Sequence, residues 1–235
     1  MKAVDVMTPE PITVGPETPV TEVAQLLLRH GISGVPVVDS GRRVLGVVSE
    51  GDLIRRPEIG TQRRRSWWLA LLGSRDPDRR FKDYLYEHGR TAADVMSPRV
   101  VSVTEGATLG DIAAVLEEYR IKRVPVLRDG RLVGIVSRAN LLQAFASARP
   151  STPLVHADDR ALRETLNRSA RDAGVDTRFV NILVAGGKVQ VWGAVRSAAE
   201  RRALLLALNS RLSEDQLETH IDLLSDQLRK TNQVV

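Results

Sequence analysis

An internal repeat constrains this chain more than any other feature of its sequence. Residues 5–9, DVMTP, recur as residues 94–98, DVMSP, at an offset of 89 residues. Residues 46–53, GVVSEGDL, recur as residues 134–141, GIVSRANL, at an offset of 88, after a hairpin that is one residue longer in the first copy. Since separate motifs recur in the same order, the sequence predicts that one small unit is built twice.

Local signals place the same elements in each copy. Thr18-Pro19 and Thr108 are typical of helix starts, and Gly31 is typical of a helix end. Two β-branched runs joined by a turn rich in Asp and Gly predict a hairpin, and a second helix then starts at a Ser-x-x-Asp/Asn turn. The copies, residues 1–56 and 91–146, are therefore predicted to be β-α-β-β-α units in an α+β fold. A unit of about fifty residues buries little core alone, so the two are expected to pack together.

The motifs that recur identify a family resemblance. The doubled pattern of Asp-Val-Met-Thr/Ser-Pro, a Val-Pro-Val strand and Gly-h-h-Ser-x-x-Asp/Asn, where h is apolar, resembles a tandem pair of CBS domains (cystathionine β-synthase domains) over residues 3 to 146. The resemblance implies a pseudo-twofold pair of repeats with two clefts. It implies that the clefts bind an adenosyl ligand, namely AMP, ADP, ATP or S-adenosylmethionine, for regulation, with no cofactor required. Such pairs often dimerise, so a homodimer is expected.

The ligand residues that the resemblance implies form two sets. In the first cleft they are Ile12, Thr13, Val35, Pro36, Ser49 and Asp52. In the second cleft they are Val101, Ser102, Arg123, Val124, Pro125, Ser137, Arg138 and Asn140. Adenine would lie against the Val-Pro strands, and the ribose hydroxyls would donate to Asp52 or to the amide oxygen of Asn140. Each serine hydroxyl would donate to a phosphate at the helix N-terminus.

A purely structural interpretation explains the same serines. Serine can cap the helix while Asp or Asn, three residues later, stabilises the first turn. A ligand is favoured because a cap alone needs no Val-Pro-Val strand beside it. Arg138 aligns with Glu50, and Arg123 has no basic counterpart in the first copy. A phosphate-rich ligand is therefore expected in the second cleft.

The excess of positive charge lies in one segment. The formal net charge is +5, and residues 55–90 contain ten Lys and Arg against five Asp and Glu, which accounts for the whole excess. The predicted insertion, residues 57–90, includes the cluster Arg63, Arg64, Arg65, Trp67 and Trp68. The favoured interpretation is that the tryptophans pack onto the domain pair as a lid while the arginines stay solvated. The alternatives are an anionic membrane surface or a protein partner. Nucleic acid is less favoured, because one short patch with interspersed acids is a poor footprint for it.

The C-terminal third is predicted to be a separate domain. A linker over residues 147–154 contains two prolines, and a tail covers residues 229–235. Between them, residues 155–228 show the order helix, strand, strand, helix, strand, with a capping box at Ser197–Glu200. This order and the Gly-Lys-Val-x-Val-x-Gly-x-Val pattern of residues 187–195 resemble a BON domain (bacterial OsmY and nodulation domain). That family is associated with membrane surfaces and phospholipid. The usual Gly-Val step before its last strand is replaced here by Ser-Glu-Asp-Gln.

No motif in the sequence predicts catalysis or a metal site. The 235 residues include no cysteine, which excludes disulfides, thiol catalysis and thiolate metal sites. The four histidines are far apart, and the sequence contains no HExxH, GxSxG, P-loop or GxGxxG motif. No signal peptide or transmembrane segment is visible, so the expected location is the cytoplasm.

Together these features predict a regulatory or sensor protein of bacterial type that is not an enzyme. An adenosyl ligand would shift the packing of the two repeats, and the linker would pass the change to the BON domain or to a partner. The alternative is a membrane-surface or protein-interaction scaffold with non-functional clefts. Binding of nucleic acid through the insertion is the less favoured third function.

Overall fold

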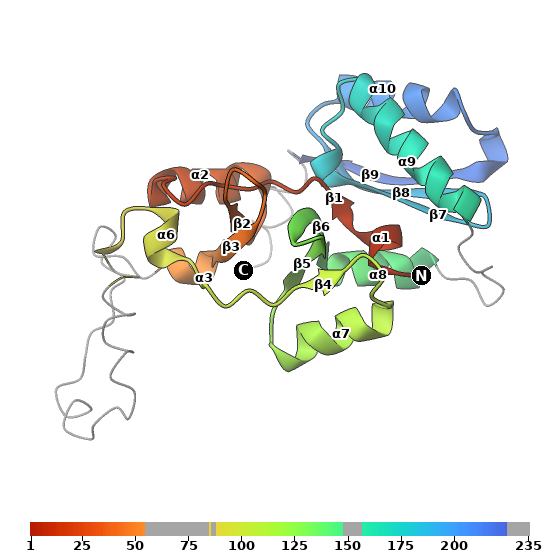
Figure 1. Ribbon diagram of the computed structural model, residues 1–235. Helices are drawn as coiled ribbons and strands as arrows, with labels where there is room; N and C mark the ends of the chain where they lie inside the picture. The colour runs from red at the N-terminus through yellow and green to blue at the C-terminus, as the bar shows by residue number, and fades with distance from the viewer. Residues whose placement is uncertain (55–84, 86–87, 148–156, 225–235) are drawn as a thin grey trace, which may run out of the picture. The chain divides into compact units, whose positions relative to one another are not determined.

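The computed structural model describes residues 1–54, 85, 88–147 and 157–224 (Figure 1). Most of the predicted insertion, the linker from residue 148 on and the predicted tail lie outside the described residues. The insertion's cluster, Arg63, Arg64, Arg65, Trp67 and Trp68, lies outside them as well.

Each copy of the repeat folds into the predicted order of elements, preceded by one short helix. The first copy contains α1 (Ala3–Val6), β1 (Thr8–Pro9), α2 (Val20–His30), β2 (Gly34–Val38), β3 (Val44–Ser49) and α3 (Glu50–Leu53). The second copy contains α6 (Ala92–Val95), β4 (Val103–Thr104), α7 (Leu109–Glu118), β5 (Arg123–Arg128), β6 (Arg131–Ser137) and α8 (Arg138–Ser147). The fold of this region is therefore mixed α and β.

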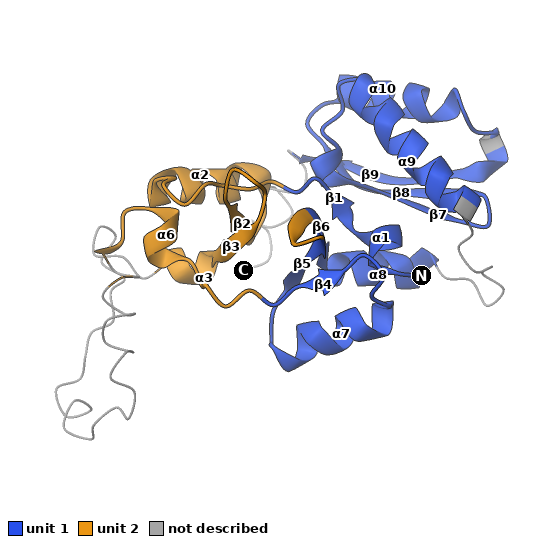
Figure 2. Ribbon diagram, in the orientation of Figure 1, with its two compact units in different colours: residues 1–11, 101–128, 133–235 blue, residues 12–100, 129–132 orange. Residues whose placement is uncertain are grey.

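The compact units of the chain do not follow the sequence repeats (Figure 2). The first unit consists of residues 1–11, 101–128 and 133–235, and the second consists of residues 12–100 and 129–132. The DVM segment that begins each copy therefore belongs to the unit that holds the other copy's main helices and strands. Residues 3–7 thus pack in the unit of the second copy, and residues 92–96 pack in the unit of the first copy. These two stretches are the lent segments.

In the first unit, the lent segment completes a hydrophobic core. Ala3, Val6 and Met7 are buried together with Ile112 and Val124. The strand β1 pairs antiparallel with β6, and the sheet has the order β1-β6-β5-β4. Burial of small and branched apolar side chains here stabilises both the segment and the sheet below it.

The second unit uses α6 in the same way. Ala92 and Val95 are buried together with Val14, Val23 and Val35. The strands β2 and β3 form an antiparallel two-stranded sheet with a register shift between Val37 and Val38.

The lent segments explain why glycine and methionine recur in both copies. A Cβ atom added to Gly46 would lie 2.6 Å from Met96 Sδ, and one added to Gly134 would overlap with Met7 Sδ. Each glycine therefore makes room for the methionine of the DVM segment. Close packing of this kind leaves no volume for even one additional methyl group.

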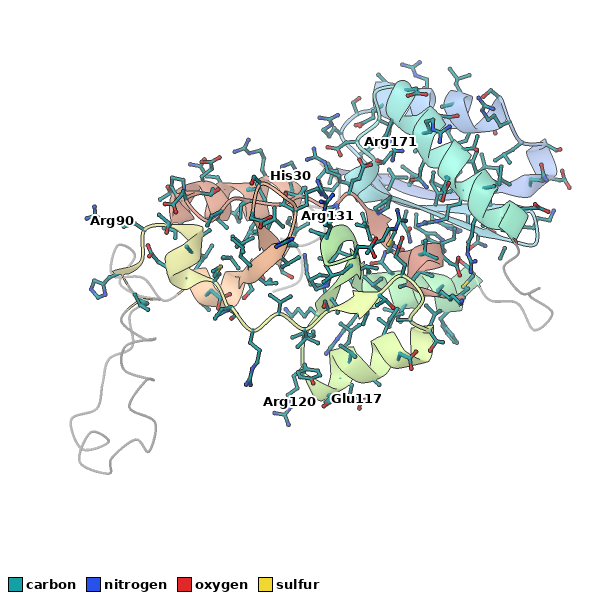
Figure 3. The ribbon with its side chains drawn as sticks, viewed as in Figure 1. His30, Arg90, Glu117, Arg120, Arg131 and Arg171 are labelled. Carbon is teal, nitrogen blue, oxygen red and sulfur yellow. The ribbon has the colours of Figure 1, made fainter. Side chains whose placement is uncertain are left out.

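The helix ends agree with the predictions in part. Thr108 caps α7, since its Oγ1 accepts a hydrogen bond from Asp111 N at 3.2 Å. Thr18 does not cap α2, because the helix begins at Val20 and the Thr18 hydroxyl accepts from Gly15 N instead. Gly31 ends α2 in the left-handed conformation, as predicted. Arg120, the equivalent residue after α7, also has a left-handed φ, of 51°. Its side chain points away from the end of α7 (Figure 3).

The C-terminal part of the chain forms a three-stranded sheet with two helices on one face. Its elements are α9 (Ala157–Asp172), a 3-10 turn (Thr177–Phe179), β7 (Val180–Ala185), β8 (Lys188–Val195), α10 (Ala198–Asn209), a 3-10 turn (Glu214–Gln216) and β9 (Leu217–Leu223). The sheet order is β7-β8-β9, with β8 and β9 parallel. Ile182 and Val184 face α9 and α10, whereas Leu183 points to the opposite face and packs in the core that contains α1. This order of helices and strands agrees with the prediction.

The predicted capping box at Ser197–Glu200 is half correct. Ser197 Oγ accepts from Glu200 N at 3.1 Å. The Glu200 carboxylate does not return to Ser197, because it accepts from Arg196 N at 2.7 Å and from Asp176 N at 3.0 Å.

None of the helices in the described ranges is long and apolar enough to cross a membrane.

Candidate functional site

The strand register gathers the predicted residues of the first cleft at one end of the β2–β3 sheet. Val14 forms a parallel bridge with Val37, so the preceding residues 12–13 run alongside residues 35–36. In the antiparallel pair, Gly34 lies opposite Ser49. The set from Ile12 to Asp52 therefore converges in space, as the sequence predicts.

The second copy repeats this arrangement. Val103 pairs in parallel with Val126, which places residues 101–102 alongside residues 124–125. Arg138 N donates to Lys122 O at 3.1 Å, so the first turn of α8 starts beside the start of β5. This matches Glu50 N in the first copy, which donates to Ser33 O at 3.2 Å.

The Val-Pro residues of both sets are buried, whereas Ile12 and Val101 are partly exposed. Val35 and Val124 have no exposed side-chain surface, because they form part of the two cores. Pro36 and Pro125 are buried as well. An adenine ring at either site would therefore meet the main chain of these strands and not the valine side chains. Ser102 and Arg138, in contrast, are exposed.

Asp52 closes the first turn of α3 onto its own start. Its Oδ2 accepts from Ser49 N and from Ser49 Oγ, both at 2.7 Å. Among the described residues, Oδ1 accepts no hydrogen bond. The capping interpretation is therefore confirmed, and it leaves one carboxylate oxygen that can accept from a ligand.

Asn140 closes the first turn of α8 in the same way, but it leaves a different atom. Its Oδ1 accepts from Ser137 N at 2.8 Å and from Ser137 Oγ at 2.7 Å. A backbone N–H can only donate, so the atom facing Ser137 N must be the amide oxygen and not the nitrogen. The prediction that the Asn140 oxygen accepts from a ribose is therefore wrong in this arrangement. The group that remains is the donor Nδ2.

The serine hydroxyls also differ from the prediction. A hydroxyl has one proton, and Ser49 and Ser137 each donate it to the Asp52 or Asn140 oxygen at 2.7 Å. A phosphate would have to displace this bond before it could accept from the serine. The remaining donors at the turn are main-chain N–H groups.

Charge separates the two sites more strongly than the predicted residues alone suggest. The equivalent positions are Ser33, Gly34, Glu50 and Asp52 in the first copy and Lys122, Arg123, Arg138 and Asn140 in the second. Their formal charge is −2 in the first copy and +3 in the second. Lys122 was missed by sequence reasoning, although its alignment with Ser33 was the signal that could have identified it.

Sequence reasoning also missed a set of contacts that fastens the C-terminal helix α9 to the lent N-terminal segment. Arg160 Nε donates to Asp5 Oδ1 at 2.7 Å, and Asp5 is 3 % exposed. Arg163 is buried, and it donates to Val4 O at 2.8 Å and to Met7 O at 2.7 Å. Burial lowers the pKa of Arg163 to about 10. No local sequence signal distinguishes these arginines from solvated ones on a polar helix.

A second contact joins the C-terminal sheet to the helix that carries Asn140. Gln143 on α8 accepts through Oε1 from Asn181 Nδ2 at 2.7 Å. Asn181 Oδ1 in turn accepts from Arg163 Nη2 at 3.3 Å. A continuous set of hydrogen bonds therefore begins one helical turn after Asn140 and ends in the C-terminal domain.

Comparisons with known proteins cover the repeat region. Residues 3–58 and 92–147 match the family model described as CBS domain. The CBS domain-containing protein CBSX1, chloroplastic, of Arabidopsis thaliana is 33% identical over 142 residues, which are 59% of this chain and 60% of that protein. The related CBSX2, chloroplastic, of the same plant is 30% identical over 158 residues, 63% of this chain and 65% of that protein. The chain thus spans less than two thirds of the length of either relative.

A solved structure agrees with these matches. The crystal structure of CBSX2 in complex with AMP superposes with a TM-score of 0.55 and 29% sequence identity, and it covers 63% of this chain and 98% of the CBSX2 chain. The repeated motifs, the family model and the fold coincide over the same residues. Residues 3–58 and 92–147 are therefore a tandem pair of CBS domains.

Proposed function

We propose that this protein is a non-catalytic regulator whose CBS repeats, packed as a pseudo-twofold pair, bind an adenosyl ligand. The observation that carries the proposal is the pair of Ser-x-x-Asp/Asn turns, each of which satisfies its own cap and still leaves one polar atom of Asp52 or Asn140 for a ligand. The AMP in the CBSX2 crystal structure supports AMP as the first ligand to test. ADP, ATP and S-adenosylmethionine are the other members of this ligand class.

The C-terminal domain would be the part of the chain that responds. Its element order and the strand pattern of residues 187–195 support a BON domain over residues 155–228. The contacts of Arg160 and Arg163 with residues 4–7, and of Asn181 with Gln143, offer a direct route from the second site to this domain. A ligand can use such a route only if it binds one arrangement of these groups more tightly than another.

Calorimetric titration of nucleotide-free protein tests the function. AMP is expected to bind with micromolar affinity, and Asp52→Ala and Asn140→Ala should each weaken one site by about tenfold or more, because each removes a side-chain hydrogen bond to the ribose. If occupancy is relayed, AMP should also slow hydrogen exchange of the β7 amides. The same titrations with the other three ligands identify the preferred one.

Two outcomes of this experiment would contradict the proposal. Absence of heat with all four ligands would leave the CBS pair without an adenosyl function. Binding that both alanine variants leave intact would place the ligand elsewhere. Binding of AMP without any change in the hydrogen exchange of the β7 amides would contradict only the relay to the C-terminal domain, and not the binding of the ligand.

A homodimer through the CBS pair is the assembly that we propose. On α8, Leu142 and Phe145 are 67% and 78% exposed, and a spacing of three residues puts them on one helical face. Phe145→Asp is expected to convert a dimer to a monomer in sedimentation velocity, because a buried charge without a partner opposes association. Leu206→Asp, at an equally exposed residue of α10, is the control. A sedimentation coefficient that Phe145→Asp leaves unchanged would exclude α8 from the interface.

A further inference from the structure

Resting on the proposed function, we infer that the two CBS sites recognise opposite hydrogen-bonding groups on the ligand's sugar. The site at Asp52 requires a free ribose hydroxyl, which can donate. The site at Asn140 accepts an adenine nucleotide whose ribose 2′ or 3′ oxygen carries a phosphate and can therefore only accept. The inference rests on hydrogen bonds and charges that differ between equivalent positions of the two copies.

The first step is the orientation of the Asn140 amide. Both hydrogen bonds from Ser137 end on Oδ1, and the main-chain donor fixes that assignment. These bonds occupy both lone pairs of the oxygen. What Asn140 can offer a ligand is therefore an N–H donor.

The second step is that this donor is available. Asn140 is 5% exposed, yet within the described ranges Nδ2 has no hydrogen-bond partner. Nδ2 is not a fully buried atom without a partner, so part of it is accessible to solvent. The oxygen of the Asn140 amide is held by Ser137, and its nitrogen still lacks a hydrogen-bond acceptor. A ligand oxygen could be that acceptor.

The third step is the contrast with Asp52. The Asp52 oxygen that Ser49 does not occupy carries lone pairs and negative charge, so it pairs with a hydroxyl and repels a phosphate. A ribose hydroxyl both donates and accepts, and it can pair with either residue. Phosphorylation of that oxygen removes the proton and adds charge, so only Asn140 remains compatible.

The surrounding charges agree with this assignment. Arg138 stands two residues before Asn140, and its backbone N–H bonds to Lys122 O, which brings a second basic residue to the same turn. The equivalent residues in the first copy are Glu50 and Ser33. An added phosphate gains attraction at the second site and meets repulsion at the first.

Two isomeric nucleotides isolate the effect. ADP and adenosine 3′,5′-bisphosphate have the same atoms and two phosphates each, and they differ only in whether the second phosphate is on the 5′ chain or on the ribose. The titrations use the full chain with Asp52→Ala, which weakens the first site, so that the second site is the tighter one and is resolved in the titration. The readout is the dissociation constant for the bisphosphate divided by that for ADP.

We expect this ratio to be near one or below in the Asp52→Ala chain. Adding Asn140→Asp should raise the ratio by about tenfold or more, because a carboxylate then faces the ribose phosphate. The turn should survive this change, since Asp occupies the same position in the first copy and makes the same bonds to its serine. Arg138→Glu, at an exposed residue, should raise the ratio in the same direction and serves as a second variant. Asn209→Asp, the same chemical change at the exposed end of α10, should leave the ratio within about twofold.

The outcomes separate this inference from the proposed function. If the Asp52→Ala chain binds ADP but binds the bisphosphate at least about tenfold more weakly, the inference is overturned and the proposed function stands. A ratio that neither Asn140→Asp nor Arg138→Glu changes would also overturn it. If none of AMP, ADP, ATP and S-adenosylmethionine binds the unmodified protein, the proposed function fails and the inference fails with it.

Discussion

Replacing Arg163 with methionine is expected to lower the free energy of unfolding of the C-terminal domain by about 3–5 kcal/mol. The guanidinium donates to three main-chain carbonyl oxygens, those of Val4, Met7 and Ile182, at 2.5 to 2.8 Å. Methionine fills a similar volume but donates no hydrogen bond, so these buried acceptors would lose their partner. Unfolding in urea, followed by circular dichroism, measures the loss.

The choice of methionine tests whether the arginine is held for its hydrogen bonds or only tolerated. Burial lowers the pKa of Arg163 to about 10, which means that the folded protein holds the charge at a cost. Replacing a buried charge by an apolar group can therefore be neutral where no polar partner is left behind. Here three carbonyls are left, and we expect their desolvation to outweigh the relief. Arg168→Met, at an exposed position of the same helix, should cost less than about 0.5 kcal/mol. Equal losses in the two variants would show that the hydrogen bonds contribute nothing.

Features governed by neighbouring residues were predictable from the sequence. The capped start of α7, the left-handed end of α2 and both hairpins depend on a few adjacent side chains and backbone angles. The repeat also allowed each signal to be checked against its copy. The prediction that α2 starts with Thr18 as its cap was wrong, because the helix begins two residues later, at Val20. The Thr18 hydroxyl accepts a hydrogen bond from Gly15 N instead.

Features governed by distant residues were not predictable. The exchange of DVM segments between the two units leaves no local signal, because Met7 and Gly134 read as ordinary strand and turn residues until they are seen in contact. Arg160 and Arg163 read as surface charges on a polar helix, although Arg160 pairs with the buried Asp5 and Arg163 is buried against the carbonyls of residues 4–7. Tertiary contacts override local pattern in both cases.

The candidate site lies between these two extremes. Strand pairing could be inferred from the motifs, so the sequence predicted which residues converge. It could not predict how the hydrogen bonds of Ser137 and Asn140 are distributed, because Asp and Asn at that position both make an acceptable cap. Which atom of Asn140 remains for a ligand depends on the direction of one amide.

Gly193→Ala is expected to prevent the C-terminal domain from reaching its folded structure. Gly193 has φ of 132°, a backbone angle that residues with a side chain rarely adopt. An added Cβ would overlap with Phe179 O and lie 3.2 Å from Val180 Cα. Those atoms belong to the backbone that enters β7, and β7 pairs with β8 through Val180 and Gly193. Rotation of a side chain cannot relieve the overlap, so the strands must separate. We expect a loss of at least about 4 kcal/mol, or unfolding of the domain.

Hydrogen exchange of the full chain resolves where this loss occurs. Amides of residues 180–195 should exchange faster by orders of magnitude, because the β7–β8 ladder protects them in the folded protein. Gly106→Ala is the control, since an added Cβ there would approach only Thr104 Oγ1, at 3.9 Å. Protection of the β7 amides that Gly193→Ala leaves intact would mean that the strand pair can accommodate a side chain at this position. Because Leu183 of β7 packs in the core that contains α1, faster exchange should extend to that helix as well. Such an extension would show that the C-terminal sheet and the N-terminal segment fold as one cooperative unit.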